Sequence, residues 1–332
     1  MAPLDAPATS PTKSLPSLSR KEAATELQAR RRARTTLIGF TKYTHQKFDA
    51  AGHHHLIGEA LDAIACGDID RLMIEMPPRH GKSELASRRF PAKLLGSASD
   101  LTVISASYNM DKAEEFGAEV RDIVRSAEYQ TLYPGVILKE DTRAKGFWRT
   151  NKGGYYIAAG VGTAITGRGT VGPIALIDDP FKDRADADSE RHREAVKAWY
   201  SSVILSRFPR AIVLVNTRWH EDDLSGWLRT MEDQGGDQWV KLTLPAIDAE
   251  GKALWPAYYP IESLERIRAS TMPRDWSALY QQNPVPDEGL FLEVGQIQRV
   301  KPPPLEEMRL FAASDYATSD GSGDWTVHIV GG

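Results

Sequence analysis

Short runs of apolar residues alternate with longer amphipathic stretches from residue 71 onward. The apolar runs are rich in β-branched residues and only a few residues long, which is typical of buried strands. The alternation predicts an α/β fold in which helices cover a mostly parallel sheet. The predicted strands are residues 71–76, 101–106, 155–159, 174–178, 211–216 and 240–245, and the predicted helices lie near residues 82–95, 109–126, 187–205 and 221–232.

The two ends of the chain differ from this central region. Residues 1–20 are rich in Pro, Ser, Ala and Thr, which favours a disordered arm. Prolines crowd residues 284–305, so a linker is expected there. Residues 306–332 contain two strand-like runs around a turn of Gly, Ser and Asp, which predicts a hairpin. The main domain is therefore expected to occupy residues 21–283, beginning with a helix whose basic end, "RRRAR", is either a solvated terminus or a contact for DNA or another partner.

Composition narrows the class of protein. The chain has 332 residues, 41% of them hydrophobic, and a net charge of −4, so a nucleic-acid contact would need a local basic patch. The one cysteine, Cys66, excludes an internal disulfide and fits a reducing compartment. No apolar run approaches the roughly 20 residues that span a bilayer, and the start of the chain lacks the apolar core of a signal peptide. We expect a soluble, cytoplasmic protein with no membrane partner.

The stretch "RLMIEMPPRHGKSELASR" (residues 71–88) passes from a predicted strand to a predicted helix through Gly81, Lys82 and Ser83. Backbone N–H groups at such a junction bind phosphate with the help of the helix N-terminus. Lys82 would reach the β- and γ-phosphates of a nucleotide, and Ser83 would bind Mg²⁺. The usual first glycine of the motif falls on Met76, so the strict pattern is not met. The alternative is an ordinary loop with a surface lysine.

A second candidate site is "IALIDDPFKD" (residues 174–183), an apolar strand that ends in Asp178 and Asp179. Asp178 at the strand end suits a water-bridged contact with Mg²⁺, and Asp179 would orient and deprotonate an attacking water. The alternative is a pair of aspartates that caps the next helix. A phosphate loop followed by paired carboxylates predicts a nucleoside triphosphatase.

Five motifs then give the chain a resemblance to a known family. They are "MPPRHGKSE", "GVGTAITGRG", "LIDDPFKD", "NTRWHEDDL" and "YQQNPVPDEGLF". Over about residues 35–330 the chain resembles the large subunit of the tailed-phage terminase, the ATP-driven DNA-packaging motor. The resemblance implies an ASCE-type (RecA-like) P-loop ATPase domain followed by an RNase H-like nuclease domain.

The resemblance also implies roles for residues of the nucleotide site. It implies ATP and Mg²⁺ at Lys82, Ser83 and Asp178, with the acidic residue after the Walker B aspartate as the catalytic base. Many members carry Glu at that position, whereas this chain has Asp179, which is one methylene shorter. Arg168 matches an arginine that reaches the nucleotide of the neighbouring subunit, although it is also readable as a loop residue paired with a local carboxylate. Arg79 matches an arginine that family members place in the phosphate loop, although it is also readable as a surface arginine. His80 and Gly81 complete the implied phosphate loop.

Two further motifs suggest contacts around the nucleotide. "VLVNTRWHEDDL" resembles the coupling motif of such motors, in which Asn216 or Thr217 would sense the γ-phosphate, while "HEDDL" is also typical of helix capping. The segment upstream of the phosphate loop lies where the family contacts adenine, so Tyr43 would stack on the base and Gln46 would read its edge. Three consecutive histidines, residues 53–55, are expected to diverge on a helix and not to bind a metal.

The C-terminal hairpin resembles the first strands of the nuclease domain, in which Asp315 would be a metal ligand. Two-metal hydrolysis with Mg²⁺ or Mn²⁺ needs carboxylates from several strands. The hairpin supplies Asp315 and conceivably Asp320 or Asp324, which are also ordinary turn residues. The nuclease site is therefore expected to be incomplete and inactive in this chain.

The partners implied by the resemblance are double-stranded DNA, a portal protein, a small terminase subunit and further copies of the chain in a ring, within a bacterial host cell. Two alternatives stay open. One is a helicase-like DNA-dependent P-loop ATPase. The other is a non-catalytic, truncated prophage remnant.

Overall fold

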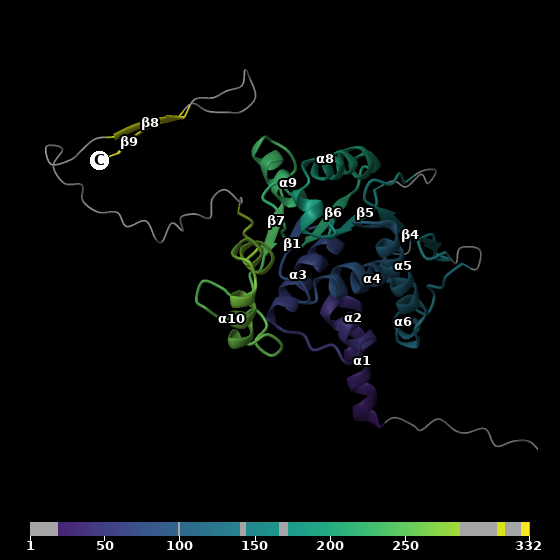
Figure 1. Ribbon diagram of the computed structural model, residues 1–332. Coiled ribbons are helices and arrows are strands. Elements are labelled where there is room, and N and C mark those ends of the chain that lie inside the picture. The colour runs from purple at the N-terminus through teal and green to yellow at the C-terminus, as the bar shows by residue number, and fades with distance from the viewer. Residues whose placement is uncertain are drawn as a thin grey trace, which may run out of the picture. The chain divides into compact units, whose positions relative to one another are not determined.

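The computed structural model describes residues 19–98, 100–139, 144–165, 172–285, 311–315 and 327–331. Contacts divide the chain into two units, Met1–Asp287 and Glu288–Gly332. The first unit contains a seven-stranded sheet with helices on both faces (Figure 1). In the second unit, β8 (Phe311–Asp315) pairs antiparallel with β9 (Val327–Gly331). Arg168, Asp320, Asp324 and the predicted arm and linker, apart from a few residues at their inner ends, lie outside the described residues.

The large sheet confirms the predicted fold class. Its strand order is β3-β4-β2-β5-β6-β1-β7, and every neighbouring pair is parallel except β3–β4. Strand β6 lies between β1 and β5, so its carboxyl end lies between the ends of those two strands. The strands are β1 (Arg71–Glu75), β2 (Thr102–Ser107), β3 (Phe147–Arg149), β4 (Tyr155–Gly160), β5 (Ile174–Asp178), β6 (Ala211–Asn216) and β7 (Val240–Thr243).

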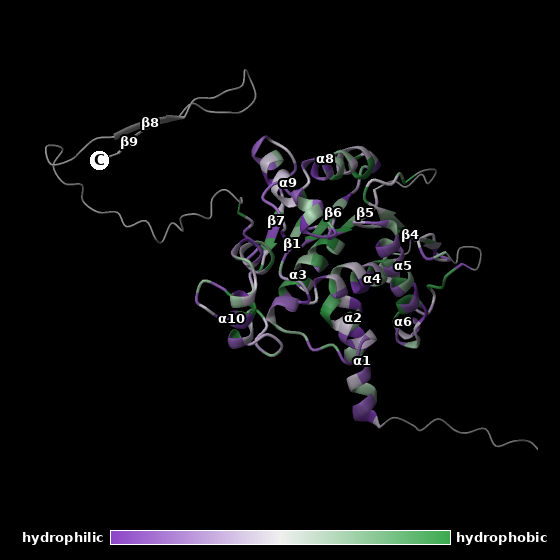
Figure 2. Cartoon of the chain, viewed as in Figure 1, coloured by the Kyte–Doolittle hydropathy of each residue, from purple (hydrophilic) through white to green (hydrophobic). Residues whose placement is uncertain are grey.

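Alternating side chains of the strands build one hydrophobic core on each face of the sheet. Leu72 and Ile74 face the core beneath α3 (Gly52–Cys66), α4 (Phe90–Ser97) and α5 (Met110–Arg125). Met73 faces the opposite core, beneath α8 (Glu190–Trp199) and α9 (Leu224–Asp233). Figure 2 shows the hydrophobic character of the strands between these helices. A sheet buried on both faces explains why its strands are continuous apolar runs.

The helices agree with the predicted ones in position, with shifts at their ends. The predicted helix 221–232 begins later, at Leu224, because the Asp223 carboxylate accepts a hydrogen bond from the Gly226 N–H and caps the helix. The predicted helix 82–95 is a π-helix, η1 (Glu84–Arg89), followed by α4. The remaining helices of this region are α1 (Arg20–Thr35), α2 (Leu37–Thr44), α6 (Ala127–Leu132), α7 (Arg184–Asp188), η2 (Tyr200–Ile204) and η3 (Leu205–Arg207).

The chain after β7 forms a small region of its own on the first unit, which we call the 244–285 segment. It contains α10 (Ile261–Ser270), α11 (Pro273–Asp275) and η4 (Trp276–Tyr280). Ala246, Leu264 and Trp276 form its core. This core is separate from the two cores of the sheet, although Leu244, at the start of the segment, packs against one of them.

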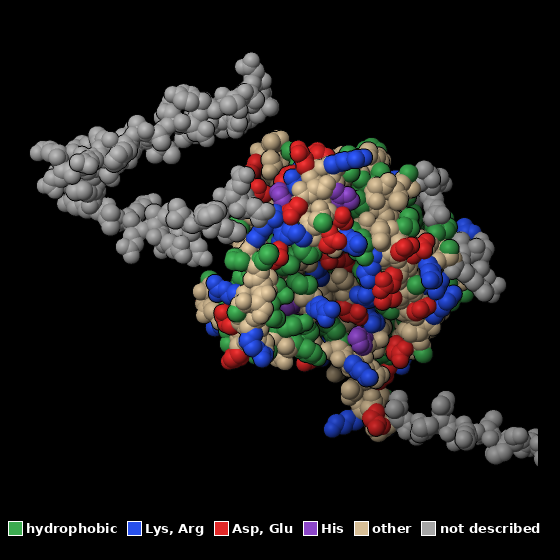
Figure 3. All heavy atoms as spheres, viewed as in Figure 1, with side chains coloured by type: hydrophobic (Ala, Val, Ile, Leu, Met, Phe, Trp, Pro, Cys, Tyr) green, Lys and Arg blue, Asp and Glu red, His purple; other side chains and the backbone are tan. Residues whose placement is uncertain are grey.

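The surface of the described residues carries both signs of charge. In Figure 3, Lys and Arg side chains are interspersed with Asp and Glu on the face shown. Within the described part of the chain, no helix combines the length and the apolar character needed to cross a lipid bilayer.

Candidate nucleotide site

The phosphate loop lies at the carboxyl end of β1. Met76 is still part of the strand pairing, because its N–H donates to the Asn216 carbonyl at 3.3 Å. The chain then turns through two residues with positive φ, Arg79 at 62° and Gly81 at 89°. Such φ values are strained for arginine and natural for glycine. In this chain the positive φ values thus come at Arg79 and Gly81, after Met76, the position of the first glycine in the strict motif.

Lys82 reaches from the loop to the neighbouring strand ends. It is 5% exposed. Its ammonium donates a short hydrogen bond to Thr217 Oγ1 and lies 3.3 Å from Asp179 Oδ2. The loop lysine, the second aspartate and the coupling segment predicted from sequence are therefore in direct contact.

Asp178 is held by two hydroxyl groups from the start of the helix that follows the loop. Ser83 Oγ donates to its Oδ1 at 3.1 Å, and Ser87 Oγ donates a short hydrogen bond to its Oδ2. Burial, together with the charge of Asp179, raises the pKa of the Asp178 carboxyl above its ordinary value. Sequence reasoning missed Ser87, although its spacing of four residues from Ser83 on a helix was an available signal.

Both the backbone and the side chain of Asp179 are held in place by hydrogen bonds. Its φ is 44°, which is unusual for a residue other than glycine. Its N–H donates to the Val215 carbonyl at 2.8 Å, and its Oδ1 accepts from the Thr217 N–H at 2.7 Å. The other carboxylate oxygen is the one near Lys82. A strained backbone held by its surroundings is typical of functional sites.

The oxygens of Ser83 and Asp178 fit a bound magnesium ion. Mg²⁺ prefers oxygen ligands and usually keeps several waters while it bridges one or two protein groups and phosphates. The Ser83 hydroxyl and an Asp178 carboxylate oxygen are 3.1 Å apart. Among the described residues, no group of three or more His, Cys, Asp or Glu side chains is arranged to hold a metal by itself. The donor set therefore suits a metal shared with a phosphate ligand.

The two candidate coupling residues point to different partners. Thr217 contacts Lys82 and Asp179 as described above. The Asn216 side chain instead donates to Ser225 Oγ at 3.2 Å on α9, and it is fully buried. Of the two residues, the structure brings only Thr217 to the phosphate loop.

A buried ion network lies directly beside this site, and we define it as Glu75, Arg218, Asp223, Arg229 and Thr243. Arg218 Nε is 2.9 Å from Asp223 Oδ2, and its Nη1 is 3.4 Å from Glu75 Oε1. Glu75 also accepts from Arg229 at 2.6 Å and from Thr243 at 2.7 Å. Both carboxylates are fully buried. Sequence reasoning recognised Asp223 as a cap but gave no partner to Glu75 or Arg218.

Gln282, in the motif "YQQNPVPDEGLF", contacts the coupling segment. Its Oε1 accepts from the Arg218 N–H at 3.3 Å, and its φ is 56°. It is 4% exposed. The motif that carried the resemblance without an assigned role thus ties the 244–285 segment to the end of β6.

Tyr43 and Gln46, the predicted adenine contacts, line a hollow of about 510 Å³ with Glu26, Arg32 and Glu128. The Tyr43 hydroxyl donates to Glu26 Oε1 at 2.6 Å. No residue of the phosphate loop lines this hollow. Adenine contact by Tyr43 and Gln46 stays a prediction.

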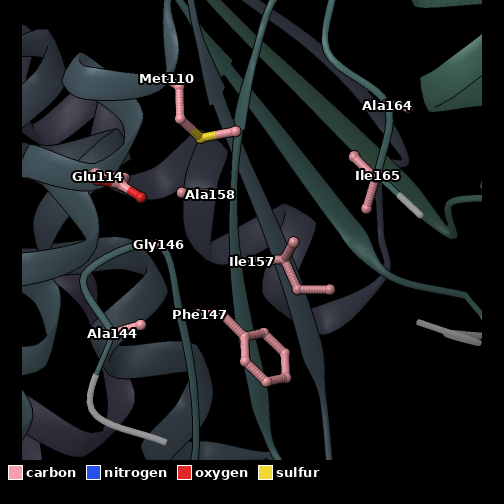
Figure 4. A pocket seen from close by; sticks show the side chains of 9 residues that line it. All are labelled: Met110, Glu114, Ala144, Gly146, Phe147, Ile157, Ala158, Ala164 and Ile165. Atoms are coloured by element: carbon pink, nitrogen blue, oxygen red, sulfur yellow. The ribbon is translucent and has the colours of Figure 1, made fainter. Parts of the chain in front are cut away.

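A second hollow, of about 250 Å³, lies at the start of α5 beside the β3–β4 pair (Figure 4). Figure 4 shows Met110 and Glu114 on one side, with Phe147, Ile157 and Ile165 around it. It includes none of the site residues predicted from sequence.

Known structures share this fold. The ATPase domain of the large terminase from Thermus phage P74-26 matches with a TM-score of 0.50 and 12% identity, over 74% of this chain and 97% of that domain. An arginine-to-alanine mutant of the same domain matches equally well, over 74% of this chain and 98% of that one. The predicted resemblance to a large-terminase ATPase domain is thereby confirmed for the fold.

Other comparisons add less. The large terminase of bacteriophage HK97 matches with a TM-score of 0.48 and 13% identity, over 71% of this chain. The chain spans about half (51%) of the length of that protein. No family model and no curated protein matches the sequence.

Proposed function

We propose that the chain is the ATPase part of a viral DNA-packaging motor, a large-terminase subunit that binds and hydrolyses ATP. The observation that carries the proposal is the meeting of Lys82, Ser83, Asp178, Asp179 and Thr217 at one edge of the sheet. These groups come from the ends of two neighbouring strands, β5 and β6, and from the loop after β1. The shared fold of a phage large-terminase ATPase domain supports the same conclusion.

In this proposal each residue performs a step that its position allows. The loop amides and Lys82 bind the β- and γ-phosphates, so Lys82 exchanges Thr217 and Asp179 for phosphate oxygens. Ser83 and Asp178 would hold Mg²⁺, which would supply neutralisation of the charge that develops on the phosphates. Asp179 is released from Lys82 by the same exchange and then orients the attacking water. Thr217, which contacts both Lys82 and Asp179, registers whether the γ-phosphate is present.

Coupling to DNA is the finer part of the proposal. It rests on the resemblance and on Gln282, which joins the 244–285 segment to Arg218 next to Thr217. Double-stranded DNA, a portal protein, a small subunit and a ring of copies are proposed as partners. Arg168 is proposed as the arginine that acts on the neighbouring copy, and Asp315 as a metal ligand of a nuclease domain.

The decisive experiment measures ATP hydrolysis by the purified chain with Mg²⁺, with and without double-stranded DNA. We expect hydrolysis that rises when DNA is added and that is lost in Lys82→Ala. The matched control is Lys112→Ala, a lysine in a helix, paired only with Glu115 and an aromatic ring. Absence of hydrolysis in the presence of DNA, with ATP still bound, would favour the non-catalytic remnant. Stimulation by single-stranded but not by double-stranded DNA would favour the helicase-like ATPase.

A further inference from the structure

Two adjacent histidines of α3 form hydrogen bonds with the backbone of the phosphate loop. His53 Nε2 lies 3.1 Å and His54 Nε2 lies 3.0 Å from the same atom, the carbonyl oxygen of His80. The two rings are only 3.9 Å apart between centroids. The expectation that these side chains diverge is therefore wrong: both lie in the first turn of α3, and the loop crosses that turn close enough for both rings to reach it.

The protonation of both rings follows from their partners. A carbonyl oxygen only accepts hydrogen bonds, so each Nε2 carries a proton. His54 Nδ1 accepts from the Ala51 N–H at 3.0 Å, which leaves His54 as the neutral tautomer with its proton on Nε2. Both side chains are almost completely buried, at 2% and 0% exposed.

The bonded carbonyl determines where the next amide points. In a trans peptide the C=O of one residue and the N–H of the next point in opposite directions, and the described residues contain no cis peptide. Because the His80 carbonyl is held toward α3, the Gly81 N–H is directed away from α3. Amides of this part of a phosphate loop are the groups that bind phosphate oxygens.

Glycine at position 81 is required by the same arrangement. Its φ of +89° disfavours any other residue, and a Cβ there would lie 2.5 Å from His54 Nε2. The imidazole of His54 therefore packs directly against the glycine backbone. A change in the orientation of this peptide would have to displace the ring.

The 244–285 segment holds the histidines in place from the other side. Trp255 makes edge contacts with His53 and His54, at centroid distances of 5.3 and 4.8 Å. The Tyr259 ring stacks on His80 at 4.5 Å. His80 Nδ1 lies 2.9 Å from the Pro78 carbonyl, so one ring nitrogen of His80 is bonded within the loop itself.

We infer that His53 and His54 are positioning residues that lock the His80–Gly81 peptide with its N–H presented to a nucleotide phosphate. The inference takes its ligand, a nucleotide, from the proposed function. His53 and His54 lie in α3, outside the phosphate-loop motif itself. Neither histidine touches the nucleotide. Each acts through the backbone of the loop.

The test uses variants that keep a ring but remove the donor. His53→Phe loses the hydrogen bond to His80 and a weaker backbone interaction with Leu254, whereas His54→Phe loses its bond to His80 together with the contact with the Ala51 N–H and is expected to lower the unfolding temperature. In His53→Phe we expect Mg²⁺–ATP to bind roughly 3- to 10-fold more weakly, which is the effect of about one hydrogen bond. KM should rise with kcat nearly unchanged. His53→Gln, whose amide reaches the position of Nε2, should restore binding.

The control is His55→Phe, because His55 is the exposed neighbour in the same helix. It should bind ATP as the unmodified protein does. If His53→Phe and His54→Phe both fold and both bind ATP as tightly as the unmodified protein does, the inference is overturned.

Crystal structures of the ligand-free unmodified protein, of His53→Phe and of His54→Phe separate this inference from the proposed function. A His80–Gly81 peptide that rotates in the variant supports the positioning role, even if the unmodified protein binds no ATP and the proposed function fails. If the peptide keeps its orientation in both phenylalanine variants, the histidines do not position it, whatever the protein binds.

Discussion

Two charged regions lie side by side at the carboxyl edge of the sheet, and they are built in opposite ways. In the candidate nucleotide site, Lys82 is paired with Asp179, whose side chain is 32% exposed and whose backbone is strained. In the buried ion network, Glu75 and Asp223 are fully buried and each accepts from more than one donor. Buried charge alone therefore does not mark a functional site. The candidate nucleotide site differs from the network in the strained backbone and partial exposure of Asp179.

The largest effect is expected in the network. Arg218→Met removes one partner of two buried carboxylates, which typically costs about 3–5 kcal/mol of stability. Denaturant titration should show this loss. Arg229→Met is the matched control, because Arg229 is 34% exposed and contacts only one of the carboxylates, and it should cost about 1 kcal/mol. If Arg218→Met cost no more stability than Arg229→Met, the two buried carboxylates would not depend on Arg218.

The nucleotide site should show the reverse behaviour. We expect Asp178→Asn to reduce ATP hydrolysis by roughly 10²–10³-fold, the range for loss of one preorganised electrostatic contact. The same variant should not lower the unfolding temperature, because burial and the neighbouring charge of Asp179 raise the pKa of Asp178 and so disfavour its ionised form in the fold. A large loss of stability without a loss of hydrolysis would place Asp178 with the structural network instead.

Asp179→Asn sharpens the comparison within the site. The amide keeps an oxygen for the Thr217 N–H, but it cannot accept the proton of water. ATP binding should be retained, and turnover should fall by at least ~10²-fold if Asp179 is the general base. Equilibrium binding and single-turnover hydrolysis, measured on the same preparation, distinguish the two quantities. Undiminished turnover would remove Asp179 from the catalytic role.

The smallest effect concerns pH. Burial, with His53, His80 and His55 nearby, lowers the pKa of His54 to about 4 from an ordinary value near 6.5. Between these values the unfolded chain binds the proton and the folded chain does not, so stability is present above pH 6.5 and is lost as the pH falls toward 4. We expect His54 to account for about 1–2 kcal/mol less stability at pH 5 than at pH 7. Thermal unfolding at both pH values should show a smaller difference in His54→Gln, and an equal difference in both proteins would contradict this assignment.

The strands and the first contacts of the site could be predicted from sequence because each depends on local pattern. Apolar runs located β1, β5 and β6, and residues at the ends of adjacent parallel strands must meet at one edge. Lys82 and Asp178 were predicted to lie together in this way, whereas Thr217 was suggested, with Asn216, by the resemblance to a coupling motif. The short antiparallel strand β3 was missed because a run of three residues carries no usable period.

The remaining contacts depend on chain segments far apart in sequence. Glu75 reads as an ordinary strand end until Arg218 and Thr243 are brought to it. The rings of His53 and His54 converge because a loop 26 residues away crosses their helix. Gln282 lies in a recognised motif, yet its partner is a backbone N–H, which no sequence pattern displays. Tertiary packing decides these positions, and local periodicity has no access to it.

The place of β6 between β1 and β5 also sets a fixed length. Glu75 pairs with Asn216 on one side of β6, and Asp178 pairs with Val215 on the other. Adjacent strands lie about 4.8 Å apart, so the ends of β1 and β5 are held roughly 10 Å from each other. The backbone hydrogen bonds of the sheet maintain this separation between β1 and β5, and the core side chains have little effect on it. The sheet therefore fixes the distance between the phosphate loop and the aspartates. Only a shift of a whole strand would change this distance.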